Sequence, residues 1–136
     1  MVDGYFIIKS KQNGSVFDIN NPAQGEGAYL TLHVKTGSDS QLWKLTEEGF
    51  LESKLNGLVA EINMASSLNG SRIVLAEKDE DLEEHQLWDF SDDGYIKSRF
   101  KEKVLESELG LMWDGTPILT NFAKDTDNQK WIIEKV

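Results

Sequence analysis

The chain has 136 residues with a formal net charge of −10, and 39% of its residues are hydrophobic. This length and hydrophobic content predict a single globular domain over residues 1–136. Because nucleic acids and anionic membrane surfaces attract basic proteins, the acidic balance argues against both as partners. The chain contains no cysteine, has no basic and apolar leader, and lacks the ~20 consecutive apolar residues of a membrane span. We therefore expect a cytoplasmic or non-classically secreted protein without membrane insertion.

Short β-type runs follow one another along the chain, and none shows a helical period. Turn dipeptides separate several of these runs: Asn13-Gly14, Asn56-Gly57, Asn69-Gly70 and Asp114-Gly115. The expected strands cover 4–10, 15–19, 29–33 and 41–45, then 51–53, 58–62, 72–76 and a run starting at 86, then 96–98, 103–106, 117–121 and 129–133.

A Gln-x-Trp stretch ends each group of four strands and recurs after 45 and then 43 residues. The three stretches contain three of the four tryptophans: Gln41-Leu42-Trp43, Gln86-Leu87-Trp88 and Gln129-Lys130-Trp131. Such a period indicates a repeated structural unit, here about 4–48, 49–93 and 94–136.

The spacing inside the units supports this alignment. Each unit has an acidic residue on its second strand, at Asp18, Glu61 and Glu106, and the glutamine follows after 23, 25 and 23 residues. The two extra residues fall in the acidic loop 77–85, which we interpret as a solvated loop, because it lacks the central glycine and ligand spacing of a calcium loop. We predict no metal site and no cofactor.

Three four-stranded units restrict the possible folds. A β-propeller needs about four to eight blades, and a solenoid needs distinct polar ends, which this chain lacks. Closure of the three units into one barrel also removes exposed sheet edges. The sequence therefore predicts an all-β protein, a β-trefoil with three four-stranded repeats and pseudo-threefold symmetry.

Three Gln-x-Trp motifs in register resemble the ricin-type (R-type) lectin family of β-trefoils over residues 4–136. The cysteines of secreted family members are absent. The resemblance implies that Trp43, Trp88 and Trp131 form the core and that the glutamines are buried hydrogen-bonding struts. It also implies a sugar site in each repeat, built from an acid on the second strand, an aromatic ring just after the third, and an asparagine before the Gln-x-Trp glutamine.

Applied to this sequence, the family pattern gives two candidate sites and one degenerate site. In the second repeat, Glu61 has no stacking ring nearby, because Ala76 and Glu77 occupy that position, and His85 precedes Gln86. The first and third repeats supply the candidate carbohydrate-binding residues, with the first site matching better: Asp18, Asn20, His33, Ser40 and Gln41, then Glu106, Asn121, Asn128 and Gln129. At the first site the simpler alternative is that Asp18 accepts a hydrogen bond from a turn amide and His33 is an ordinary surface residue.

Trp113 lies in the loop before Asp114-Gly115, outside the repeated motif. We expect it to pack against its own hairpin or to plug the barrel. The alternative is an exposed ring that stacks on a sugar or anchors a partner.

The leading hypothesis for function is a non-catalytic lectin for glycans of the galactose or N-acetylgalactosamine type, with several sites or a homo-oligomer providing avidity. The alternative is a β-trefoil protein-interaction module, such as a protease inhibitor or toxin accessory subunit, with degenerate sugar sites. An enzyme fits worst, because the chain has no cysteine, only two histidines and no phosphate-binding glycine loop.

Overall fold

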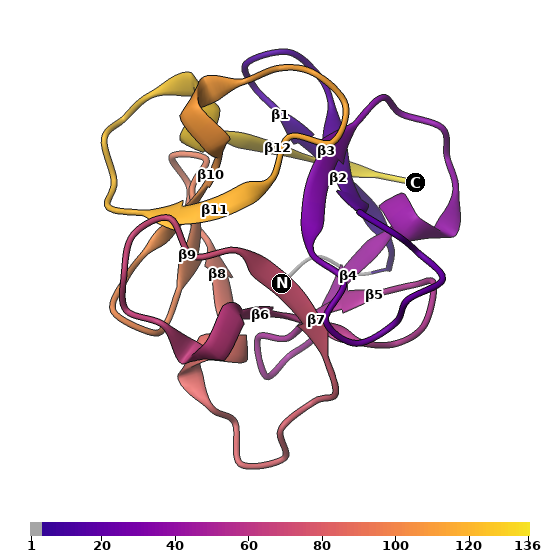
Figure 1. Ribbon diagram of the computed structural model, residues 1–136, viewed down its shortest axis with the longest axis vertical. Helices are drawn as coiled ribbons and strands as arrows, with labels where there is room; N and C mark the ends of the chain where they lie inside the picture. The colour runs from indigo at the N-terminus through magenta and orange to yellow at the C-terminus, as the bar shows by residue number, and fades with distance from the viewer. Residues whose placement is uncertain (1–3) are drawn as a thin grey trace.

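Twelve short β-strands make up the fold in a computed structural model, which describes residues 4–136 (Figure 1). The expectation that the chain has no leader peptide falls in part on residues 1–3, which lie outside the described residues. Five single turns of 3-10 helix interrupt the described chain at Asp39–Gln41, Asn63–Ala65, Glu84–Gln86, Glu108–Gly110 and Asp127–Gln129. The strands are β1 (Phe6–Ser10), β2 (Val16–Ile19), β3 (Leu30–His33), β4 (Trp43–Leu45), β5 (Leu51–Ser53), β6 (Val59–Ile62), β7 (Ile73–Ala76), β8 (Trp88–Phe90), β9 (Ile96–Ser98), β10 (Val104–Ser107), β11 (Ile118–Asn121) and β12 (Trp131–Lys135).

The first and fourth strands of each repeat form a barrel. β1 pairs antiparallel with β12 and β4, β4 pairs with β5, and β8 pairs with β9. Single backbone contacts connect the remaining neighbours: the Trp88 N–H donates to the Gly49 carbonyl and the Trp131 N–H donates to the Gly94 carbonyl, each at 2.9 Å. The ring of strands leaves few free edges, as the repeat pattern predicts.

The second and third strands of each repeat form three hairpins, β2–β3, β6–β7 and β10–β11, that cover one end of the barrel. Isolated bridges join the hairpins to one another, between Tyr29 and Val74, Thr31 and Pro117, and Arg72 and Leu119. Figure 1 shows the three repeats as lobes around a common centre, coloured from indigo to yellow. The β-trefoil predicted from the sequence is confirmed.

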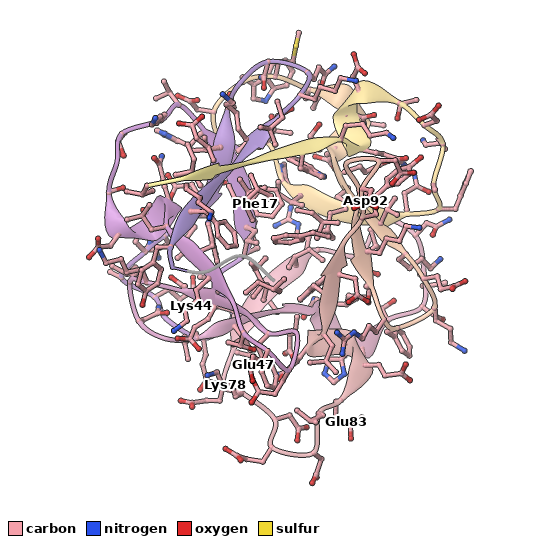
Figure 2. All side chains as sticks on the ribbon, turned by 180° about the vertical axis from the view of Figure 1, so that it is seen from behind. Phe17, Lys44, Glu47, Lys78, Glu83 and Asp92 are labelled. Atoms are coloured by element: carbon pink, nitrogen blue, oxygen red, sulfur yellow. The ribbon has the colours of Figure 1, made fainter. Side chains whose placement is uncertain are left out.

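The core lies inside the barrel and under the hairpins, and it is built mainly from inward-facing aliphatic and aromatic side chains. Trp43 and Trp88 have no exposed surface and Trp131 is 5% exposed, which confirms their predicted core role. Phe17, labelled in Figure 2, packs edge-to-face on Trp131 with ring centroids 4.7 Å apart.

The acidic loop between β7 and β8 projects from the body of the molecule and carries Glu83 at its outer side (Figure 2). Most of its residues are exposed, as expected for a solvated loop. No helix in residues 4–136 has the length and hydrophobicity needed to cross a membrane.

Candidate functional site

Each Gln-x-Trp motif holds the acidic strand of its own repeat by two hydrogen bonds. The indole N–H donates to the backbone carbonyl of the residue just before the acid, and the glutamine amide donates to the acid's carboxylate. The indole bonds are Trp43 to Phe17 at 3.4 Å, Trp88 to Ala60 at 2.9 Å and Trp131 to Leu105 at 3.1 Å. The glutamine bonds are Gln41 to Asp18 at 3.0 Å, Gln86 to Glu61 at 3.1 Å and Gln129 to Glu106 at 2.9 Å.

The remaining hydrogen-bonding capacity of each glutamine closes the loop that leads to it. The same amide nitrogen donates to a backbone carbonyl and the side-chain oxygen accepts a backbone N–H, so these buried groups are paired. The partners are Val34 and Thr36 for Gln41, Glu77 and Asp79 for Gln86, and Phe122 and Lys124 for Gln129. The predicted role of the glutamines as buried struts is confirmed.

The first repeat presents a carboxylate beside an imidazole. Asp18 Oδ2 accepts from Gln41, and Oδ1 accepts from the Ile19 N–H at 2.7 Å. His33 Nδ1 lies 4.0 Å from Asp18 Oδ2, beyond hydrogen-bond distance, and the His33 side chain is 41% exposed. The backbone N–H that Asp18 accepts therefore belongs to its own strand β2 and not to a turn, and the carboxylate borders a ring that faces solvent.

Asn20 and Ser40 lie at the margins of this first site. Asn20 follows the end of β2 and is exposed, and its backbone N–H donates to the Tyr29 carbonyl at 2.9 Å. Ser40 is buried in the 3-10 turn, with its hydroxyl 3.1 Å from that of Ser38. The structure therefore brings together Asp18, His33 and Gln41 of the five predicted residues.

The second repeat places a histidine beside its carboxylate and no ring at the end of its third strand. His85 Nε2 lies 3.1 Å from Glu61 Oε2, the same oxygen that accepts from Gln86. Ala76 ends β7 where the first repeat has His33, and it supplies no ring. The second repeat therefore has a carboxylate and a histidine near it, and the expectation that its sugar site is degenerate stays a prediction.

The third repeat brings Glu106, Asn121 and Gln129 together. The Asn121 amide donates to both Glu106 oxygens at 3.1 Å, and Lys124 Nζ lies 3.8 Å from Oε1. Asn128 borders the same group, and its amide donates to the Ser107 carbonyl at 3.1 Å. A depression of about 410 Å³ lies over these residues, but its carboxylate is already hydrogen-bonded to protein groups.

Two groups near these carboxylates were not foreseen. Lys124 stands beside Glu106 in the third repeat, and Asp114 of the third repeat lies beside His33 of the first, with Oδ2 3.8 Å from Nε2. No sequence signal identifies Asp114, because its proximity to His33 depends on how the repeats pack. Within residues 4–136 no cluster of three or more His, Cys, Asp or Glu side chains is placed to hold a metal ion.

The expectation that Trp113 is packed into the hairpin or the barrel is wrong. Its side chain is 66% exposed, and the neighbouring Met112 is 56% exposed. The physical reason is that Trp43, Trp88, Trp131 and the aliphatic side chains already fill the core, which leaves no room for a fourth indole.

Comparison with known proteins agrees with this geometry. The model of the ricin-type β-trefoil lectin domain matches residues 4–131. A designed threefold-symmetric protein, ThreeFoil, is 25% identical with a TM-score of 0.89, over 98% of this chain and 100% of ThreeFoil. The C-half of the earthworm R-type lectin, in complex with GalNAc, is 25% identical with a TM-score of 0.83, over 97% of this chain and 98% of that one.

The agglutinin of Rhizoctonia solani shares the fold at 23% identity, with a TM-score of 0.80 over 100% of this chain and 97% of the agglutinin. No individual curated protein sequence matches the chain significantly. The family model covers nearly the whole chain, and the glutamine of each Gln-x-Trp motif is hydrogen-bonded to the acid of its own repeat. The chain therefore belongs to the ricin-type β-trefoil lectin family.

Proposed function

We propose that this protein is a non-catalytic lectin that binds galactose- or N-acetylgalactosamine-type sugars at its first repeat. Family membership and the lectin neighbours support carbohydrate binding in general. The observation that carries the finer proposal is the group of Asp18, His33 and Gln41, in which a strut fixes the carboxylate and a half-exposed ring stands beside it.

The chemistry of a neutral sugar suits this group. A carboxylate accepts hydrogen bonds from two adjacent hydroxyls, and a flat ring covers the apolar face of the pyranose. Asp18 keeps spare acceptor capacity, because each oxygen accepts one hydrogen bond and a carboxylate has about four lone-pair sites. The second and third repeats have Ala76 and Asn121 at the position of His33, and Asn121 donates to both Glu106 oxygens. The first repeat is therefore the best-supported site.

Solved structures of a similar lectin with bound sugars support the choice of ligand. The earthworm lectin C-half was solved with GalNAc, and a mutant of the same domain with 6'-sialyllactose. A single open site of this kind binds at around millimolar strength, which corresponds to about −4 kcal/mol. Binding to cells or glycoproteins would then require several copies of the site, for example in a homo-oligomer.

The test is a titration with galactose and N-acetylgalactosamine, followed by NMR chemical shifts or calorimetry, of the wild type and of Asp18→Asn. The amide keeps the shape of the side chain and removes its charge, so the fold is expected to persist while binding is lost. The matched control is Asp92→Asn, which changes an exposed aspartate in the β8–β9 turn (Figure 2). The proposal would be refuted if the wild type bound neither sugar, or if Asp18→Asn bound the sugars as tightly as the wild type and Asp92→Asn do.

The alternative function is a protein-interaction module. One observation favours it. Side chains of the same repeat already contact the carboxylates of the second and third repeats, His85 at Glu61 and Asn121 at Glu106. A glycan array that shows no binding to any sugar would favour this alternative and exclude the lectin.

A further inference from the structure

The loop between β10 and β11, residues 108–116, contacts the first repeat at both of its ends. We call it the third-repeat loop. Figure 1 shows this orange segment extending from β10 towards β3 before it returns to β11. The Leu32 N–H donates to the Thr116 carbonyl and the Gly115 N–H donates to the Leu32 carbonyl, both at 2.8 Å. Asp114 Oδ1 accepts from the Val34 N–H at 3.0 Å. The end of the loop is therefore fixed to β3, next to His33.

The beginning of the same loop is fixed to the first repeat as well. The side chain of Gln12 donates to the Gly110 carbonyl, and that of Asn13 donates to the Met112 carbonyl, both at 3.2 Å. Trp113 lies between these anchors, and its own carbonyl accepts from the Thr116 hydroxyl at 2.7 Å. The backbone of Trp113 is thus held in place while two thirds of its side chain is exposed to solvent.

Trp113 stands next to the first site because Asp114 belongs to that site. Asp114 Oδ2 is 3.8 Å from His33 Nε2, whereas Asp18 Oδ2 lies near the other ring nitrogen, Nδ1. The Cα atoms of Trp113 and Asp114 are about 3.8 Å apart, as for any two consecutive residues. The repeat alignment places Gly25 and Leu68 where the third repeat has Trp113, so the third-repeat loop alone offers an aromatic ring at this position.

An exposed indole on a fixed backbone is unfavourable in water unless something covers it, because apolar surface costs about 25 cal/mol per Å² when hydrated. Indole rings also stack on the apolar faces of sugars, in the way that is proposed for the imidazole of His33. Continuity with the first site therefore identifies the occupant of the indole face as a second sugar ring of the same glycan.

We infer that the first site extends onto Trp113 and takes an oligosaccharide, with one sugar ring at Asp18 and His33 and the neighbouring ring against the indole. This inference rests on the proposed lectin function and adds the ligand class: glycans of two or more rings, read by residues from the first and third repeats together. Trp113 is the residue that favours such glycans over a monosaccharide.

The test compares galactose with lactose and with β1,3-linked galactobiose by calorimetry, using the full chain. In the wild type at least one disaccharide is expected to bind about threefold to tenfold more tightly than galactose, the effect of one aromatic contact. Trp113→Ala is expected to remove this advantage and leave galactose binding unchanged. Trp113→Phe keeps a ring and is expected to retain most of the advantage.

The matched control is Leu68→Ala, which truncates another exposed apolar side chain, 73% exposed, at the position of the second repeat equivalent to Trp113. It is expected to leave all three affinities unchanged. The inference is overturned if no disaccharide exceeds galactose in the wild type, or if the advantage persists in Trp113→Ala, or if Trp113→Ala weakens galactose and disaccharides equally. In each of these cases loss of binding in Asp18→Asn would still uphold the lectin function, whereas absence of all sugar binding would refute both.

Intrinsic tryptophan fluorescence gives an independent test of contact between Trp113 and the second sugar ring. Trp43, Trp88 and Trp131 are buried, so acrylamide quenching reports mainly on Trp113. The bound disaccharide is expected to protect this fluorescence more than saturating galactose does. Equal protection by the two sugars would contradict contact between the indole and a second ring.

Discussion

The side-chain amide of Gln41 donates a hydrogen bond to Asp18 Oδ2 at 3.0 Å, and this bond joins the scaffold of the first repeat to its proposed sugar site. The same bond forms in the other two repeats. What differs among the repeats is the group on the outer side of the carboxylate: His33 at 4.0 Å in the first repeat, against His85 at 3.1 Å and Asn121 at 3.1 Å in the others. The same clamp is therefore accompanied by a ring at the end of the third strand in the first repeat alone, because Ala76 and Asn121 occupy that position in the other two.

Replacement Gln41→Leu is expected to lower the free energy of unfolding by about 1–3 kcal/mol, because it leaves the Val34 carbonyl and the Thr36 N–H without their partner in a partly buried place. Urea denaturation followed by fluorescence measures the change. Galactose binding is expected to weaken as well, since Asp18 loses its strut.

The control for this variant is Gln24→Leu, at an exposed glutamine whose only side-chain hydrogen bond in the described chain is a 3.5 Å contact to the Glu26 carbonyl. A change within about 0.5 kcal/mol is expected there. Equal destabilisation by the two variants would show that the buried network around Gln41 adds nothing to stability.

Replacement Trp88→Phe is expected to destabilise the protein by about 2–3 kcal/mol, because it leaves a cavity in the core and removes the indole bond to the Ala60 carbonyl. The matched substitution Trp113→Phe, at the exposed tryptophan, is expected to change stability by less than about 0.5 kcal/mol. Thermal and urea unfolding of both variants measure the difference. Similar losses in the two would mean that Trp113 is packed in solution.

Glu134 on β12 joins two lysines from the first repeat, Lys9 at 3.0 Å and Lys35 at 3.1 Å. The hydrogen bond from Lys9, followed by that from Lys35, holds the pKa of Glu134 below its ordinary value. A carboxylate with a lowered pKa stabilises the folded state above its unfolded pKa, and this contribution is lost as the pH falls through the folded pKa.

Glu134→Gln is therefore expected to be slightly less stable than the wild type at pH 7 and equal to it once the pH falls well below about 4. The effect is small, because exposed ion pairs contribute little, and it is expected to fade in roughly 1 M salt. Thermal melts at several pH values provide the measurement, with Glu26→Gln at an exposed glutamate as control. A difference that grows as the pH falls would contradict the assigned ion pairs.

Asn121→His is expected to open the third repeat to sugar. The substitution removes the amide that donates to both Glu106 oxygens and places the first repeat's ring type at the equivalent position. The number of galactose molecules bound per chain, measured by calorimetry, is expected to rise from about one towards two, because the third repeat would add a site to that of the first. Asn121→Ala, which frees Glu106 without adding a ring, is the control and is expected to give a smaller gain. Unchanged stoichiometry in Asn121→His would show that Glu106, one methylene longer than Asp18, does not suit the sugar.

Much of the fold was predictable because its signals are local. The constant spacing from Asp18, Glu61 and Glu106 to the following glutamine reflects strands of fixed length, and only the solvated loop before Gln86 absorbs extra residues. The glutamines themselves sit in 3-10 turns ahead of β4, β8 and β12, which the strand pattern did not distinguish from the strands. A single turn has no periodicity that a sequence can display.

The candidate site was predictable only within one repeat. Asp18, His33 and Gln41 were found by counting along the chain, and the structure brings them together. Ser40 shares their register, yet it is buried beside Ser38, because the direction of a side chain in a turn depends on its packing.

The sequence by itself determined the β-trefoil, because the spacing of the strands within each repeat is local, and the family resemblance implied the core tryptophans and the glutamine struts. Only the tertiary structure decided that Asp114 lies beside His33, that Asn121 covers Glu106 and that Trp113 faces solvent. These relationships join side chains across loops and across repeats, where closure of the barrel sets the distances. The role of Gln41 as a buried strut is implied by the family resemblance, whereas its bond to Asp18 and the surroundings of that carboxylate are seen only in the tertiary structure.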